Sequence, residues 1–184
     1  MRRLFANFGY EPAERFNASS GHSRLLYYTD QKIKVDVFIG DFQQCHVLPL
    51  ERRLSIHPIT LPLADLLLTK LQVAKLSDKD VTDILALILD NKLSEDESGL
   101  NVLYLARFLA KDWGWWRTST ETLDRLNVEL PRVGLDPVQK STVQGRLHDL
   151  RHAIDAEPKS IPWRARSKVG DRWGWRVDPE EGRA

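Results

Sequence analysis

The chain has 184 residues, of which 42% are hydrophobic and 29% charged, a composition typical of a soluble globular protein of one domain with an appendage or of two small domains. Its 27 Lys and Arg residues nearly balance its 26 Asp and Glu residues, and the net charge of +1 argues against nonspecific nucleic-acid binding by the whole molecule. The single cysteine, Cys45, excludes an internal disulfide and fits a reducing compartment.

The N-terminal segment is basic, but no apolar run follows it, and no stretch reaches the roughly 20 apolar residues of a membrane span. We therefore expect a cytoplasmic protein without a signal peptide and without a membrane partner. Leu4, Phe5 and Phe8 have helical spacing, which predicts a short helix that ends at Gly9. Residues 11–23 are rich in Asn, Ser and Gly, and this composition predicts a loop.

Two alternating segments predict a β-hairpin. Residues 24–28 and 32–39 read as strands, and the short polar stretch between them reads as a tight connection. In the second strand Asp36 lies on the open face of the sheet. The other face of this strand is wholly apolar and is predicted to pack against helices; its side chains are Ile33, Val35, Val37 and Ile39.

After the hairpin the apolar period changes to that of a helix. A proline in the first turn and a stripe of leucines predict a helix over residues 61–76, with Lys70 on or beside the stripe. Ser77 and Asp80 have the spacing of a capping box, which predicts a second helix that extends to about residue 90. The chain is then predicted to form an acidic loop and three further helices, over residues 91–99, 100–111, 120–130 and 136–156.

The C-terminal segment, residues 157–184, contains several prolines and glycines and is predicted to be mostly irregular. Between residues 159 and 176 it carries six Lys or Arg residues interleaved with three tryptophans, a composition that can bind single-stranded nucleic acid by stacking and charge. We favour the alternative that the tryptophans pack on the domain and leave the arginines outside. Residues 112–117 (DWGWWR) resemble residues 171–176 (DRWGWR), and each is interpreted as a glycine-marked helix end anchored by tryptophans.

Asp36 is the first candidate for a functional side chain. An aspartate between two valines of a strand is costly unless it faces solvent, a cation or a hydrogen-bond donor. It is therefore interpreted either as a carboxylate for metal binding or phosphate transfer, or as an exposed polar residue paired with Lys34 or with a cross-strand partner.

A second group of candidates lies on the two predicted helices. Lys70 is interpreted as a cation that meets a nucleotide triphosphate, or as a lysine that extends along the apolar surface. Asp80 and Asp83 are interpreted as a base or as residues that orient Lys70. The alternative makes Asp80 a helix cap and Asp83 the partner of Lys79 in a surface ion pair.

Three segments together resemble the nucleotidyltransferase-fold superfamily: residues 35–38 (VDVF), 60–72 (TLPLADLLLTKLQ) and 79–83 (KDVTD). They look most like the minimal bacterial and abortive-infection toxin-type nucleotidyltransferases, which have a polymerase-beta-like core. The resemblance implies an α+β fold, in which a small mixed β-sheet is backed by helices and an α-helical region follows. The expected division is an α+β domain over residues 1–95, a helical region over 96–156 and a basic, Trp-rich tail over 157–184.

The resemblance also implies roles for individual side chains. The catalytic residues that it implies are Asp36, Lys70, Asp80 and Asp83, with Asp36 as the metal ligand. The nucleotide-binding residues that it implies are Lys34, Lys70 and Lys79. Clustered carboxylates of such proteins hold Mg²⁺, which neutralises a nucleoside triphosphate and activates the attacking hydroxyl. The partners expected on this basis are a nucleotide, an RNA or protein acceptor, and an antitoxin or a second copy of the chain.

The sequence departs from the family signature before Asp36. No glycine turn and no pair of acids on one strand precedes it, and in a complete member these elements would lie upstream of Met1. Three hypotheses follow. The chain transfers a nucleotide with acids supplied from elsewhere; or it is a non-catalytic member that binds a nucleotide or a protein; or it binds nucleic acid through residues 157–184.

Overall fold

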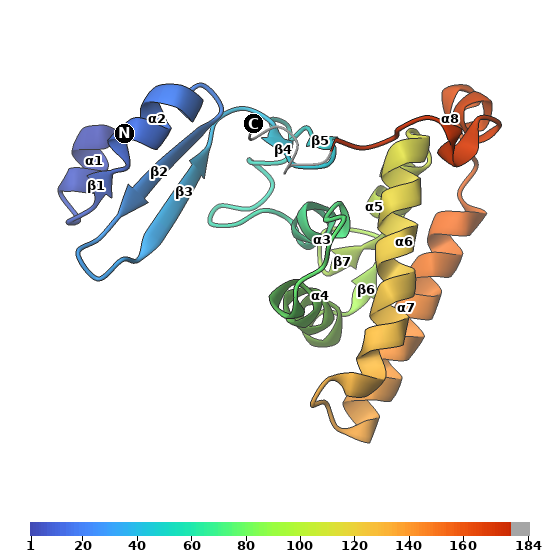
Figure 1. The fold of residues 1–184 in the computed structure, drawn as a ribbon. Helices are drawn as coiled ribbons and strands as arrows, with labels where there is room; N and C mark the ends of the chain where they lie inside the picture. Colours follow the sequence, from blue (N-terminus) through green and yellow to red (C-terminus); the bar gives the residue numbers. More distant parts are fainter. Residues whose placement is uncertain (178–184) are drawn as a thin grey trace. The chain divides into compact units, whose positions relative to one another are not determined.

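The structure, a computed structural model, describes residues 1–177 and contains two compact units (Figure 1). The first unit comprises Met1–Phe42 and Val47–Glu51, and the second comprises Gln43–His46 and the residues from Arg52 onward. Small β-sheets are backed by helices, so the α+β class predicted from the sequence is confirmed. No helix within residues 1–177 is both long and apolar enough to span a membrane.

The first unit is a three-stranded antiparallel sheet with two short helices. Its elements are α1 (Arg2–Ala6), β1 (Glu11–Pro12), α2 (Glu14–Ser20), β2 (Arg24–Tyr28) and β3 (Lys34–Phe38). The central strand is β2, which pairs with β1 on one side and β3 on the other. The predicted hairpin is therefore confirmed. The predicted N-terminal helix is confirmed as well, but it ends at Ala6; Gly9 lies in the turn that follows, with a left-handed φ of +73°.

Two predictions for this unit are wrong. Residues 11–23 are not a loop, because they contain β1 and α2. One of the polar residues that suggested a loop instead joins α2 to β2. Asn17 of α2 forms two hydrogen bonds with the backbone of Leu26, at 3.0 and 2.7 Å. The apolar face of β3 that was predicted to pack against helices is open at both ends, since Ile33 is 52% exposed and Ile39 41% exposed. Both isoleucines lie outside the paired part of the strand.

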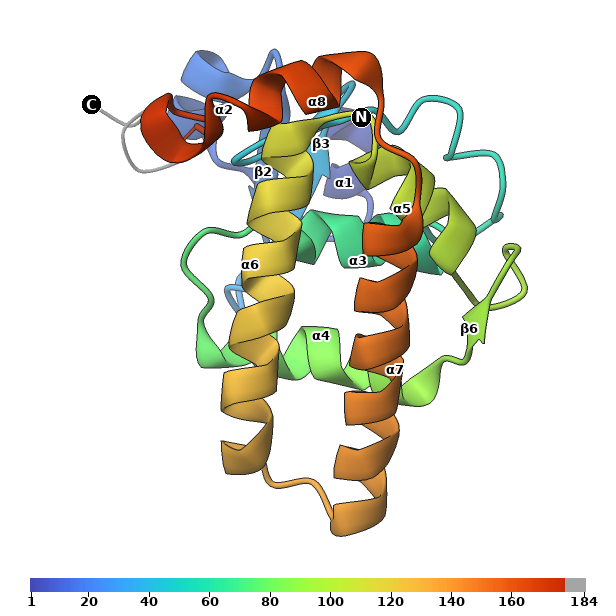
Figure 2. The ribbon, with the colours of Figure 1, turned by 90° about the vertical axis from the view of Figure 1, so that its right-hand side faces the viewer.

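The second unit is dominated by helices. By sequence, the short strand β5 (Val47–Leu48) belongs to the first unit, and β4 (Phe42–Gln43) lies where the chain passes from the first unit to the second. The elements of the second unit are α3 (Leu63–Leu71), α4 (Asp78–Asp90), β6 (Leu93–Ser94), β7 (Leu100–Asn101), α5 (Val102–Leu109), α6 (Trp113–Glu129), α7 (Pro137–Ala156) and α8 (Ile161–Ser167), with 3₁₀ turns at Leu130–Arg132 and Gly170–Arg172. Helices α6 and α7 lie side by side, and α3 and α4 pack across them (Figure 2). Their core is apolar and includes Leu67, Leu71, Ile84, Ile88, Leu123, Leu126, Leu147 and Ile154.

Helix starts in this unit follow their caps. The capping box of Ser77 and Asp80 begins α4 as predicted, and Asp136 with Gln139 forms a second box at the start of α7. Helix α6 begins seven residues before the prediction, because the carboxylate of Asp112 accepts the backbone N–H of Trp115 at 3.0 Å. Gly114 lies within the first turn of α6, so the interpretation of residues 112–117 as a glycine-marked helix end holds for the N-terminal end of this helix.

The C-terminal segment is more regular than predicted, because residues 161–167 form α8 and a 3₁₀ turn follows. The favoured interpretation, that its tryptophans pack on the domain, holds for two of them. Trp163 meets the ring of Trp116 edge-on at 5.2 Å between centroids, and Trp175 meets Trp113 at 5.9 Å. Trp173 remains 72% exposed. The end of the predicted tail, residues 178–184, lies outside the described residues.

Candidate functional site

Asp36 lies in β3 and is held by two cations of its own unit. Arg24, on the neighbouring strand, donates to its carboxylate at 2.7 and 2.6 Å, and the ammonium of Lys34 lies 3.1 Å away. Burial raises the pKa of the Asp36 carboxyl, but the hydrogen bonds from Arg24 and Lys34 outweigh it and lower the pKa overall. Asp36 is therefore an ionised carboxylate whose two oxygens are both occupied by basic side chains, as the ion-pair interpretation predicted.

Lys70, in the last turn of α3, lies between two carboxylates from the first turns of α4. Its ammonium donates to Oδ1 of Asp80 at 3.0 Å and to Oδ2 of Asp83 at 2.8 Å. Burial lowers the pKa of Lys70, but the hydrogen bonds to Asp83 and Asp80 raise it by more. The structure thus brings together three residues that the sequence analysis predicted to act together.

The two aspartates of this cluster have further partners. The other oxygen of Asp80 accepts the hydroxyl of Ser77 at 2.7 Å, and Asp83 accepts the ammonium of Lys79 at 2.8 Å. Burial raises the pKa of Asp80, but Ser77 and Lys70 lower it overall, and the hydrogen bonds from Lys70 and Lys79 lower the pKa of Asp83. A carboxylate with a lowered pKa is a weak base at neutral pH. The cluster therefore fits an orienting role for the aspartates better than a role as general base.

The predicted site residues fall into two groups. Asp36 and Lys34 belong to the first unit, whereas Lys70, Lys79, Asp80 and Asp83 belong to the second. Each group has its ion-pair partners within its own unit.

The donor atoms that Mg²⁺ requires are not assembled among residues 1–177. No group of three or more His, Cys, Asp or Glu side chains in this range could hold a metal ion. The oxygens of Asp36 accept from Arg24 and Lys34, and those of Asp80 and Asp83 accept from lysines and Ser77. These residues therefore do not fit the magnesium ion that the resemblance implies.

A cavity that the sequence analysis missed lies at the start of α6. Its volume is about 510 Å³, and aromatic and basic side chains line it, including Trp113, Trp163, Trp175, Lys111, Arg166 and Arg176. The signal for it was the similarity of residues 112–117 to residues 171–176, because these two segments face each other. Trp113 and Trp175 pack together, and Arg117 donates to Asp171 at 3.1 and 3.2 Å.

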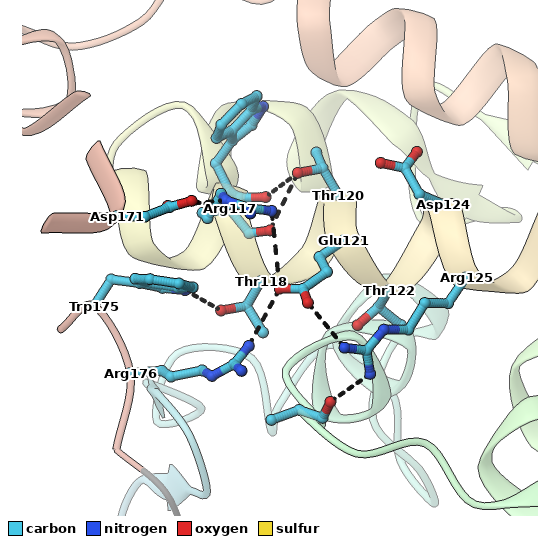
Figure 3. Close-up of polar contacts among 12 residues, drawn as sticks. Arg117, Thr118, Thr120, Glu121, Thr122, Asp124, Arg125, Asp171, Trp175 and Arg176 are labelled. Carbon is cyan, nitrogen blue, oxygen red and sulfur yellow. Dashed lines mark hydrogen bonds and ion pairs between the residues drawn. The ribbon is translucent and has the colours of Figure 1, made fainter. Parts of the chain in front are cut away.

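His46 lies at the wall of this cavity and is neutral at physiological pH. Its Nε2 atom is 2.8 Å from the hydroxyl of Thr118. The same hydroxyl accepts the indole N–H of Trp175 at 3.2 Å, a contact that Figure 3 shows. Burial lowers the pKa of His46 to about 4. The backbone N–H of His46 donates to the side chain of Gln72 at 3.0 Å, which fixes this segment to the end of α3.

Comparison with known proteins found no relative of this chain. No protein-family model matches the chain, and no curated protein and no solved structure is similar to it. The resemblance to nucleotidyltransferases therefore stays a hypothesis that rests on three short segments, and the proposals below rest on the chemistry of the side chains.

Proposed function

We propose that the protein binds a nucleotide and that Lys70 contacts its phosphates. The observation that supports this is the position of the Lys70 ammonium, which Asp80 and Asp83 hold at 3.0 and 2.8 Å. The resemblance assigns a nucleotide contact to this same lysine. A cation that is held in place before its ligand arrives loses little side-chain entropy on binding.

The geometry of Lys70 leaves capacity for an anion. An ammonium group has three donor hydrogens, and its described hydrogen bonds use two of them, to Asp80 and Asp83. The side chain of Lys70 is 31% exposed, so a ligand can reach it from solvent. Lys79 adds a second cation beside Asp83. Phosphate oxygens accept charge-assisted hydrogen bonds from such groups.

The proposal concerns binding. Transfer of the nucleotide through Mg²⁺ stays an expectation from the resemblance, because residues 1–177 do not assemble a magnesium site. The non-catalytic hypothesis, in which a protein of this type binds a nucleotide without transferring it, is therefore the one that we carry forward.

Calorimetric titration with ATP, GTP, CTP and UTP, each with and without Mg²⁺, tests the proposal. Lys70→Ala is expected to weaken binding about 10- to 100-fold, the loss of one charge-assisted hydrogen bond of about 1.5–3 kcal/mol. Lys92→Ala is the matched control, because it removes an exposed lysine of the second unit that lies outside the Lys70 cluster. We expect Lys92→Ala to change affinity less than about threefold. If none of the four triphosphates binds, or if Lys70→Ala binds as the wild type does, the proposal fails.

A transfer assay separates the two remaining alternatives. The protein is incubated with each α-labelled triphosphate, Mg²⁺ and RNA or protein acceptors. Binding without incorporation fits a non-catalytic protein, whereas incorporation that Asp36→Ala abolishes would establish transfer and assign Asp36 to it.

A further inference from the structure

The cavity at the start of α6 has the size and construction of a small-molecule site. Three separate stretches of the second unit line it: residues 45–46, 111–114 and, from α8 onward, 162–177. Its volume of about 510 Å³ lies within the range of roughly 300–1,000 Å³ that ligand pockets occupy. None of the residues of the Lys70 cluster lines it.

The aromatic walls of the cavity are held by packing. The ring of Trp175 lies at 79° to that of Trp113, and Trp163 lies at 75° to Trp116. Gly114 permits the close approach of the C-terminal segment, since a Cβ atom there would lie 2.7 Å from the carbonyl oxygen of Trp175. The walls are therefore formed before any ligand binds.

The cavity also carries positive charge from Arg166 and Lys111. Arg166 donates to the backbone oxygens of Gly170 and Trp173, both at 2.7 Å, and its guanidinium lies 4.6 Å over the ring of Trp113. Within residues 1–177, neither Arg166 nor Lys111 forms an ion pair. Both cations are therefore available to an anion in the cavity.

The remaining charged groups of the cavity are already engaged. Arg176 is paired with Glu121 at 3.2 Å, and Figure 3 shows its side chain directed at α6. The carboxylate of Asp112 caps α6 by accepting the N–H of Trp115. The lining therefore has two cations without an ion-pair partner among the described residues, Lys111 and Arg166. It also has one carboxylate, that of Asp112, which the N-terminus of α6 stabilises.

From these observations we propose that the cavity binds a nucleoside monophosphate, with its base against the tryptophans and its phosphate at Lys111 and Arg166. Aromatic walls suit a planar base, and two cations suit a phosphate dianion. The indole N–H of Trp163, a residue of the lining, is enclosed and has no acceptor among the described residues. The site is separate from Lys70 and does not depend on the function proposed above.

Single-stranded nucleic acid is a poorer occupant. Such a ligand needs successive exposed rings on which its bases stack. Trp163 and Trp175 are partly buried against α6, and Trp173 is the one tryptophan among the described residues that is largely exposed.

Titration of the full chain with AMP, GMP, CMP and UMP, followed by calorimetry and tryptophan fluorescence, tests the proposal. We expect at least one monophosphate to bind and to quench the fluorescence. The matching nucleoside, which lacks the phosphate, and inorganic phosphate, which lacks the ring, are each expected to bind at least about tenfold more weakly.

Two variants locate the site. Lys111→Ala removes an exposed cation of the cavity and is expected to weaken binding of the monophosphate about tenfold. Trp163→Ala should weaken it by a similar factor, and Trp163→Phe, which keeps an aromatic ring, by less. Lys92→Ala is the control, because it removes an exposed lysine outside the cavity.

The outcomes separate this proposal from the preceding one. Retained monophosphate binding in Lys70→Ala supports the cavity, whereas its loss there, with Lys111→Ala unaffected, would assign the ligand to Lys70 and overturn the cavity site. Nucleoside or phosphate binding as tight as the monophosphate also overturns it. So does tight binding of a short RNA by a chain that binds no monophosphate.

Discussion

At the scale of single residues, the burial of His46 links stability to pH. Its pKa is about 4 in the folded chain, against 6.5 for a solvent-exposed histidine. Because the unfolded chain binds a proton first as pH falls, the contribution of this group is fully present above about pH 6.5 and is lost as pH falls towards 4. A difference of roughly 2.5 units corresponds to about 3 kcal/mol.

Urea unfolding at pH 7 and pH 4 tests this linkage. The free energy of unfolding of the wild type should fall by about 3 kcal/mol more over this interval than that of His46→Gln, which cannot titrate. Carboxylates with lowered pKa values, such as Asp80 and Asp83, also destabilise the fold as pH falls, but they are common to both proteins and cancel. Equal pH dependence in the two proteins would show that His46 is not buried as a neutral ring.

Asp65 is a second residue whose substitution is expected to change stability strongly, because of its buried surroundings. Its side chain is fully buried, accepts from Arg53 at 2.7 Å and from the hydroxyl of Tyr104 at 2.9 Å, and has a pKa raised by burial. Asp65→Ala leaves Arg53 without this partner, and we expect the free energy of unfolding to fall by about 3–5 kcal/mol. Tyr104→Phe removes one hydrogen bond and keeps the ring that Arg53 covers at 3.8 Å, so its cost should be about 1–3 kcal/mol. Chemical denaturation measures both; similar small costs would contradict a tightly coupled Asp65–Arg53 pair.

At the scale of elements, the contact between α6 and the C-terminal segment depends on the absence of a side chain at Gly114. In an open helix, Gly→Ala stabilises by about 1 kcal/mol. At Gly114 the added Cβ would lie 2.7 Å from a backbone oxygen of Trp175, so the segment must move. We expect Gly114→Ala to lower the melting temperature and to speed cleavage by trypsin after Arg172 and Arg176.

Gly145 provides the matched control for this substitution. It lies within α7, and a Cβ atom added there would meet nothing within 4 Å. Gly145→Ala should therefore raise stability by about 1 kcal/mol and leave the rate of tryptic cleavage unchanged. An unchanged cleavage rate in Gly114→Ala as well would mean that the segment does not rest on α6.

The elements that the sequence predicted correctly are those determined by neighbouring residues. The capping pair Ser77 and Asp80 and the hairpin of β2 and β3 depend on separations of a few residues, and so does the meeting of Asp80 and Asp83 on one helical face. Helix α2 was missed because its tie, between Asn17 and Leu26, reaches a strand that follows it. The cavity was missed for a similar reason at longer range.

The contacts that build the cavity join parts of the chain that are far apart in sequence. Arg117 and Asp171 are 54 residues apart, and His46 and Thr118 are 72 apart. Nothing in the spacing of either pair predicts that they meet. The Trp-Gly-Trp pattern is visible twice in the sequence, and its two copies pack against each other in the structure. Two short similar segments do not by themselves indicate this contact, because each could equally mark the end of a separate helix.

At the scale of the whole molecule, the two units have unequal cores. Of the buried apolar side chains within residues 1–177, four belong to the first unit: Leu26, Tyr27, Leu48 and Leu50. The second unit contains fully buried side chains from all of its long helices, including Leu67, Ile84, Leu123, Leu147 and Ile154. Since burial of apolar surface is the main favourable term in folding, the first unit should open at lower free energy.

Native-state hydrogen exchange measures this difference. The backbone amides of β2 and β3 that pair across the hairpin should exchange through a local opening that leaves α6 and α7 folded, with protection at least about 2 kcal/mol lower than that of amides in the middle of α6. If the amides of α6 and α7 instead lost their protection first as denaturant is added, the second unit would be the less stable one. Amides of β2 as strongly protected as those of α6, and lost at the same denaturant concentration, would show that the two units unfold as one cooperative body.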